Sequence, residues 1–391
     1  MKRSLPLLIL FLLMYHLSYS QDGENIWTLT YDNGGRIYCM VINPVNQAIM
    51  YTGSLDSGVY KTTNSGLNWT RVNSGMNYIK VQCLAISNSN PNILYAGTDH
   101  LGSTNSGVYK TTNAGANWTL MSSGFAETSK GIQAIAIDWT NPDIAYLTLF
   151  DGLVNSTNGI YKTTNGGTNW FAIISGIGPT KNFLSLAMNP KNSNELYVGS
   201  SIDVTTSTGP PHIYKTYNGG TNWIEMSSGL PTLSSNNDPV RAISISTLDT
   251  SIVLAALFMN DTAGGAYLST NSGATWTKKP NGIQNITGTL SRAAVIRPGS
   301  NTEFYIGYDN SGTGTKGIMR TTNGGNNWIS FNGGSLPNTA AIRSLVFRTS
   351  NDTTLYAGAA STAGIRGVHE YTWPYIIGIG GIGTKTPDVF M

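Results

Sequence analysis

Three arginines recur about once every fifty residues, and each follows the first residue of a short apolar segment: Arg241, Arg292 and Arg343. A guanidinium presents five N–H donors in a fixed fork, which suits a carboxylate or a sulfate. Equivalent positions in earlier segments carry Tyr38, Gln82, Gln133 and Leu184. We treat the polar ones as candidate ligand-binding residues. Salt bridges and water inside a channel would explain the same arginines without a ligand.

A second set of candidate residues is acidic. An aspartate follows the next apolar segment in six repeats: Asp56, Asp99, Asp151, Asp203, Asp261 and Asp309. Such carboxylates could bind hydroxyl groups of a ligand beside the arginines. The alternative is that each one caps its own turn, as aspartates often do in loops.

A repeated motif shows which elements must position these side chains. It reads Ser/Thr-x-Asn-x-Gly-x-x-Trp, and its six copies end at Trp69, Trp118, Trp170, Trp223, Trp276 and Trp328, spaced 49 to 53 residues apart. Asn can bond nearby backbone groups, Gly permits positive φ, and Trp can pack a turn against a sheet. The motif therefore predicts a tight turn between two strands.

Each repeat also contains apolar strands separated by turn residues. The pattern predicts four short antiparallel strands per repeat, which is a β-propeller blade. The first strand of a repeat recurs seven times, so we predict an all-β, single seven-bladed β-propeller. These first strands begin at Ile37, Val81, Ile132, Phe183, Val240, Ser291 and Ile342. The seventh repeat lacks the Trp motif and the last strand that follows it. Asn25–Leu29, at the other end of the chain, resembles the segment around the motif Trp in the other repeats. We therefore expect the N-terminal strand to complete the last blade and close the ring.

The predicted blades assign candidate residues to two faces. The start of the first strand and the loop between strands two and three share one face, which carries the arginines and aspartates. The repeated turn lies on the opposite face. We therefore expect any ligand to bind where the first strands begin.

The motif resembles the Asp-box, or BNR, repeat, with Asn in place of Asp in every copy, over residues 26–371. The resemblance implies a propeller of the superfamily that includes sialidase-like, sortilin-like, xyloglucanase-like and photosystem II assembly factor-like proteins. In that family the box is structural and lies away from the active site. Asn in place of Asp also removes six negative charges, so we do not expect the turns to bind calcium.

Two function classes follow from this resemblance. A sialidase-like site would need a Tyr/Glu nucleophile pair and an Arg-Ile-Pro start, but Arg36-Ile37-Tyr38 lacks the proline. A xyloglucanase-like site needs two carboxylates and, typically, a cleft between two propellers, whereas this chain predicts one propeller. We therefore favour a non-catalytic scaffold that binds an extracellular glycan or protein. The alternative is a glycoside hydrolase acting on extracellular polysaccharide.

The composition disfavours several classes of binding partner. Charged residues are 11% of the chain, with 23 basic and 20 acidic residues and no basic block, which disfavours nucleic-acid binding. The scattered histidines and two cysteines lack metal-ligand spacing, so we expect no metal and no cofactor. No segment after the N-terminal region is apolar enough to enter a membrane. We expect a monomer.

The two ends predict export. Lys2 and Arg3 precede the apolar segment Leu5–Tyr15, which predicts a signal peptide at residues 1–20 and a secreted or cell-surface protein. The propeller would then span residues 21–375. Residues 376–391 would form a Gly-rich tail, whose end is similar to the linker before a type IX sorting domain in Bacteroidetes-like proteins. Truncation before such a domain and a chance match both remain open.

Cys39 and Cys83 hold the same register on neighbouring first strands. An oxidising compartment would permit a disulfide between them. Inner strands of neighbouring blades can also lie beyond the Cα separation of about 7 Å that a disulfide allows. Buried free thiols are then the alternative.

Overall fold

The structure is a computed structural model. It describes residues 26–32, 35–99, 105–125, 131–150, 159–177, 181–203, 210–232, 239–258, 264–283, 291–309, 317–348, 354–361 and 364–373, without the side chains of residues 181 and 201–203. The predicted signal peptide and tail, Asp151, Asp261 and the side chain of Asp203 lie outside the described residues.

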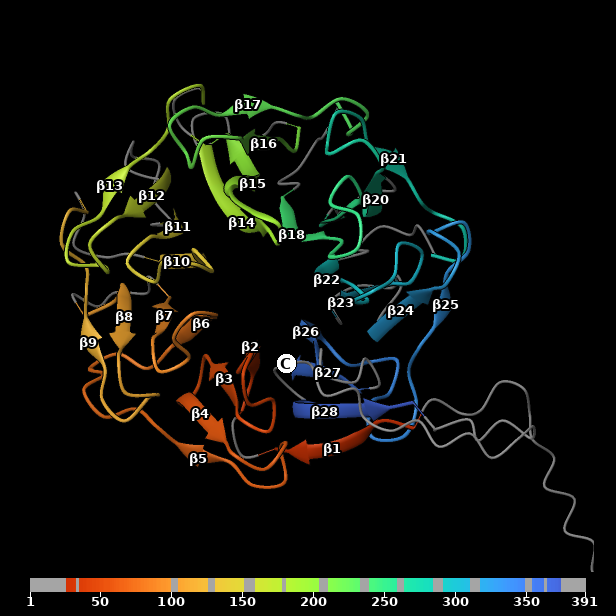
Figure 1. Cartoon of the computed structure of the whole chain (residues 1–391). Helices are drawn as coiled ribbons and strands as arrows, with labels where there is room; N and C mark the ends of the chain where they lie inside the picture. The colour runs from red at the N-terminus through yellow and green to blue at the C-terminus, as the bar shows by residue number, and fades with distance from the viewer. Residues whose placement is uncertain are drawn as a thin grey trace, which may run out of the picture.

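Seven four-stranded antiparallel sheets form a closed ring around a central channel (Figure 1). The fold is therefore a seven-bladed β-propeller, as predicted. No helix in the described ranges is long and apolar enough to cross a membrane. We number the blades from the one that contains β2.

The strands are grouped here by their place in a blade. The inner strands are β2 (Ile37–Ile42), β6 (Val81–Ile86), β10 (Gly131–Ile137), β14 (Lys181–Asn189), β18 (Val240–Ile245), β22 (Ser291–Ile296) and β26 (Ile342–Arg348). The second strands are β3 (Met50–Ser54), β7 (Leu94–Thr98), β11 (Ala145–Phe150), β15 (Asn192–Asp203), β19 (Val253–Leu257), β23 (Phe304–Tyr308) and β27 (Thr354–Ala360). The third strands are β4 (Gly58–Thr62), β8 (Val108–Thr111), β12 (Gly159–Thr163), β16 (Ile213–Thr216), β20 (Gly265–Ser269), β24 (Gly317–Thr321) and β28 (Arg366–Thr372). The outer strands are β5 (Thr70–Arg71), β9 (Thr119–Leu120), β13 (Phe171–Ala172), β17 (Ile224–Glu225), β21 (Thr277–Lys278), β25 (Ile329–Ser330) and, from the N-terminal segment, β1 (Thr28–Tyr31).

The last blade takes its outer strand from the N-terminal segment. Its sheet order is β1-β28-β27-β26, and Thr28 pairs with Glu370 across β1 and β28. Trp27 directly precedes β1, just as Trp69 precedes β5. The predicted closure of the ring is confirmed, with the strand beginning at Thr28.

The repeated motif forms one hydrogen-bonded turn in all six copies. In blade three, the Thr163 hydroxyl donates to Asn165 Oδ1 at 2.9 Å and accepts from the Gly167 N–H at 2.9 Å. Asn165 Oδ1 also accepts from the Asn169 N–H at 3.0 Å. The residue before the motif Gly is left-handed too, even where it is Ser65 (φ 60°). Ordinary side chains disfavour that conformation, so these bonds hold a conformation with a steric cost.

The apolar core lies between neighbouring blades. Tyr51 and Val59 of blade one pack with Trp118 of blade two, for example. The Trp118 indole N–H donates to the Val72 carbonyl at 2.8 Å, so this motif Trp bonds the preceding blade. Lysines add a contact in the other direction, since Lys61 Nζ donates to the Ala114 carbonyl at 3.1 Å. Each repeated turn is therefore bonded to both its own blade and a neighbour.

The two cysteines are free thiols. Cys83 donates its S–H to the Ile132 carbonyl of the next inner strand, with a sulfur–oxygen distance of 3.4 Å. Ser185 makes the matching contact between blades four and five, where its hydroxyl donates to the Val240 carbonyl at 2.8 Å. The thiol of Cys83 thus links two inner strands in the way that the Ser185 hydroxyl links another pair.

Candidate functional site

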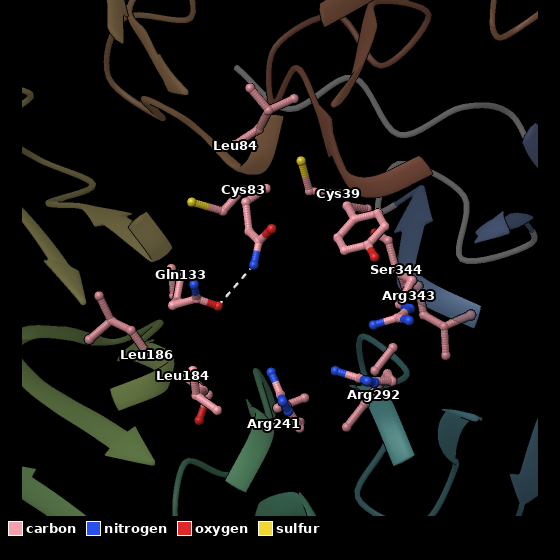
Figure 2. A pocket seen from close by; sticks show the side chains of 18 of the residues that line it. Cys39, Cys83, Leu84, Gln133, Leu184, Leu186, Arg241, Arg292, Arg343 and Ser344 are labelled. Atoms are coloured by element: carbon pink, nitrogen blue, oxygen red, sulfur yellow. Dashed lines mark hydrogen bonds between the residues drawn. The ribbon is translucent and has the colours of Figure 1, made fainter. Parts of the chain in front are cut away.

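A β-bulge in every inner strand aims one side chain into the channel. The pairing of β2 with β3 joins Ile37 to Ser54 and then Cys39 to Gly53, which leaves Tyr38 without a partner residue. All seven described inner strands skip the same position, occupied by Tyr38, Gln82, Gln133, Leu184, Arg241, Arg292 and Arg343. A bulge re-aims a side chain and often lies beside a functional site. These bulges explain why one residue per blade reaches the axis (Figure 2).

The three arginines come together at the channel mouth, on the face where the inner strands begin. Arg343 Nη2 lies 2.7 Å from Asp309 Oδ2, and Arg292 Nε lies 3.2 Å from the same oxygen. These side chains are largely buried, with exposed fractions of 16%, 17% and 7% for Arg343, Arg292 and Asp309. Two guanidinium groups therefore share one carboxylate.

Aromatic rings support the arginines from the side. The Phe258 ring centroid lies 4.3 Å from the Arg292 guanidinium carbon and 5.2 Å from that of Arg241. The Tyr38 ring centroid lies 4.9 Å from the Arg343 guanidinium carbon. Cation–π contacts of this kind fix the planes of the guanidinium groups. The arginines are thus held in place before any ligand arrives.

The site carries an excess of buried positive charge. Burial, followed by the neighbouring charges of Arg292 and Arg343, lowers the pKa of Arg241 well below its ordinary value. Burial and Arg343 likewise lower the pKa of Arg292 to about 10. Both shifts have the direction that burial and neighbouring positive charges produce, because both disfavour the charged form of a guanidinium.

Two buried donors lack an acceptor. The Nε atoms of Arg241 and Arg343 have no hydrogen-bond partner among the described residues. A buried donor left without an acceptor costs about 1–3 kcal/mol. A ligand oxygen at these atoms would remove that cost.

A cavity of about 350 Å³ opens over this cluster and continues into the channel. Amides line it opposite the arginines, where Gln82 Nε2 donates to Gln133 Oε1 at 2.9 Å (Figure 2). Leu55, Asp99 and Leu184 complete the wall. One part of the mouth is therefore cationic, and the rest offers amide groups, the Asp99 carboxylate and two leucines.

The predicted aspartates separate into different roles. Asp309 joins the arginine cluster and Asp99 lines the cavity. Asp56 pairs instead with Arg36 at 2.7 Å, and that guanidinium lowers the pKa of the Asp56 carboxyl. The Asp56 carboxylate is not among the groups that line the cavity. Asp203 ends β15, in keeping with its predicted place after the second strand.

Sequence reasoning did not identify Phe258 as a site residue. Phe258 directly follows the second strand of its blade, β19. In two other blades the residue at this place is an aspartate, Asp99 after β7 and Asp309 after β23. The later position of this repeat's aspartate, at Asp261, was the available signal. An aromatic residue in that place stacks against two arginines instead of neutralising them.

The described charges of the site suit the recognition of an anionic group. Within the described part of the chain, no group of three or more potential ligand side chains could hold a metal ion. The carboxylate of Asp99 lines the cavity, whereas that of Asp309, which is not among the lining residues, is bonded to two arginines. Glu370, whose pKa is raised by burial, lies in β28 and does not line the cavity. The described residues thus offer charge recognition of an anionic group.

Comparison with known proteins supports the fold. No family model and no curated protein matches the sequence. A solved structure of YCF48 bound to D1 peptide is 13% identical, with a TM-score of 0.57 over 89% of this chain and 97% of that one. U3-55K is 11% identical, with a TM-score of 0.60 over 89% of this chain and 98% of that one. A GH74 enzyme of Niastella koreensis is 16% identical, with a TM-score of 0.41 over 81% of this chain and 59% of that one.

These likenesses extend to the propeller architecture alone, because the identities are low. The fold is shared with YCF48, solved as a peptide complex, and with U3-55K, whereas the GH74 overlap is too loose to support an argument. The Asp-box resemblance and the secreted location remain predictions. Function must therefore be argued from the channel mouth itself.

Proposed function

We propose that the protein is a secreted, non-catalytic propeller that binds a glycan or protein ligand through an anionic group at the channel mouth. The observation that carries the proposal is the sharing of Asp309 by Arg292 and Arg343, with Arg241 beside them. The described groups leave positive charge uncompensated in a cavity that a ligand can enter. Charge-assisted bonds in such a setting are strong.

The other half of the mouth suits neutral polar parts of the same ligand. Gln82 and Gln133 expose amide groups that can donate to and accept from hydroxyls or peptide groups. Anchoring by arginine and orientation by amides is how many ligand sites divide affinity and specificity. A glycan with an acidic substituent and an acidic peptide both meet this description.

The experiment is a glycan-array and acidic-peptide screen of residues 21–391, run beside a polysaccharide-hydrolysis assay. We expect saturable binding of acidic ligands without released products, and we expect Arg292→Ala to lose that binding. Arg71→Ala is the matched control, since Arg71 lies on the exposed outer strand β5. Product formation from any polysaccharide would favour a glycoside hydrolase instead.

A further inference from the structure

Among the described residues, the cluster of Arg241, Arg292, Arg343 and Asp309 carries an excess of two positive charges. The groups whose charges act on Arg241 and Arg292 include each other, Arg343 and Asp309. Three guanidiniums against the single carboxylate of Asp309 give these four described residues a net charge of +2, and the Asp99 carboxylate lies elsewhere in the cavity wall. A ligand with one negative charge would leave half of this excess in place.

The donors also outnumber what a carboxylate can accept. The cluster comprises three guanidinium forks, from three consecutive blades, and the buried Nε atoms of Arg241 and Arg343 lack acceptors. A carboxylate has two oxygens in one plane. A tetrahedral oxyanion presents three oxygens in three directions and keeps a fourth for a linkage to the rest of a ligand.

The channel wall fits a strongly hydrated group. Leu84 and Leu186 of the inner strands point away from the channel into the blades (Figure 2), whereas Leu184, at a bulge, lines the cavity. The other six bulge positions carry polar side chains, beside the inner edges of the strands, whose backbone N–H and C=O groups are strong hydrogen-bonding groups. Most of this wall can therefore bind a strongly hydrated group.

We propose that the anionic group is a tetrahedral dianion, which is a phosphate monoester or inorganic phosphate, in preference to a carboxylate. This inference rests on the proposed function, since it names the ligand chemistry of the same site. A dianion matches both the charge excess of the cluster and its three converging forks.

The test is isothermal titration calorimetry at low ionic strength with glycerol phosphate, inorganic phosphate, sulfate and acetate as probes. At pH 7.5 we expect each dianion to bind at least tenfold more tightly than acetate. From pH 7.5 to 5, glycerol phosphate should weaken by about tenfold, because its second pKa is near 6 and the monoanion replaces the dianion. Sulfate keeps its charge over this range and reports any titration of the protein.

A matched pair of variants locates the preference. Arg241→Gln removes one charge from the cluster and should reduce the ratio of sulfate to acetate affinity at least fivefold. Arg71→Gln removes one charge from the exposed outer strand β5 and should leave the ratio unchanged. An unchanged ratio in Arg241→Gln, with a folded protein by circular dichroism, would overturn the inference.

The remaining outcomes separate the two proposals. Equal affinity for acetate and the dianions, both lost in Arg292→Ala, would overturn the dianion inference and leave the anionic site standing. Failure of all four probes to bind would overturn both. Tighter binding of glycerol phosphate than of inorganic phosphate would support a phosphate ester on a larger ligand, and the reverse order would support the free ion.

Discussion

The indole N–H of Trp27 donates a hydrogen bond of 2.8 Å to the carbonyl oxygen of Phe331, across 304 residues of sequence. Trp27 is 1% exposed, and its ring lies edge-on to Phe331 with a centroid distance of 5.8 Å. Trp118 makes the same kind of bond to the blade before it. Trp27 therefore acts as the seventh motif tryptophan, although no motif precedes it.

Loss of Trp27 should weaken the closure of the ring. Trp27→Ala should lower the free energy of unfolding by about 3–5 kcal/mol, the range for truncating a buried Trp. The control is Trp69→Ala, because Trp69 is only half-buried and bonds the Gly66 carbonyl within its own turn. Denaturant unfolding measures both variants. Equal losses in the two would contradict a special role for Trp27.

The repeated turn should accept Asp in place of Asn. Asn165 accepts both of its turn bonds at Oδ1, so Asn165→Ala should cost about 1–2 kcal/mol of stability. Asn165→Asp keeps that oxygen and should stay within about 0.5 kcal/mol of the parent. Thermal unfolding of the two variants distinguishes them. A loss as large for Asp as for Ala would show that the amide nitrogen is required.

Acid should weaken the last blade through His369. This side chain is 1% exposed in β28 and bonds the Ser335 hydroxyl at 2.9 Å. Burial lowers its pKa from 6.5 to about 4, so the unfolded chain binds a proton at pH values where the folded one does not. Its stabilising contribution is complete above pH 6.5 and falls by roughly 3 kcal/mol between pH 6.5 and 4.

The variant His369→Gln isolates this effect from the other titrating groups. We expect the difference in unfolding free energy between the parent and this variant to become less favourable to the parent as the pH falls from 6.5 to 4. Urea unfolding at intervals of half a pH unit measures it. A difference that is constant with pH would show that His369 does not titrate in this way.

Much of the fold could be predicted from the sequence, because the repeated motif marks each blade. Trp27 showed which strand closes the ring, and the chain order of strands placed Arg241 and Asp309 on one face. The β-bulge could not be predicted, because it is a shift in how two strands pair and no particular residue type marks it. The sharing of Asp309 by Arg292 and Arg343 depends on distances between neighbouring blades, which a linear pattern does not contain.

The thiols should be free and protected. Burial raises the pKa of the Cys83 thiol to about 12 and raises that of Cys39 well above its ordinary value. Because the thiolate is the reactive form, a thiol reagent at pH 8 should react slowly with the folded protein. Denatured protein should give two free thiols. A count near zero in denaturant, restored by a reductant, would establish a disulfide between Cys39 and Cys83.

The central claim is that the protein binds its ligand at the arginine cluster and not at the repeated turns. Charge-assisted contacts contribute roughly 1.5–3 kcal/mol each, so the double variant Arg292→Ala/Arg343→Ala should weaken sulfate binding at least tenfold in calorimetric titration. Asn165→Ala, on the opposite face, should lose stability while keeping the parent affinity. Binding that survives the loss of both arginines but disappears in the Asn165 variant would place the ligand site on the face of the repeated turns and contradict the account.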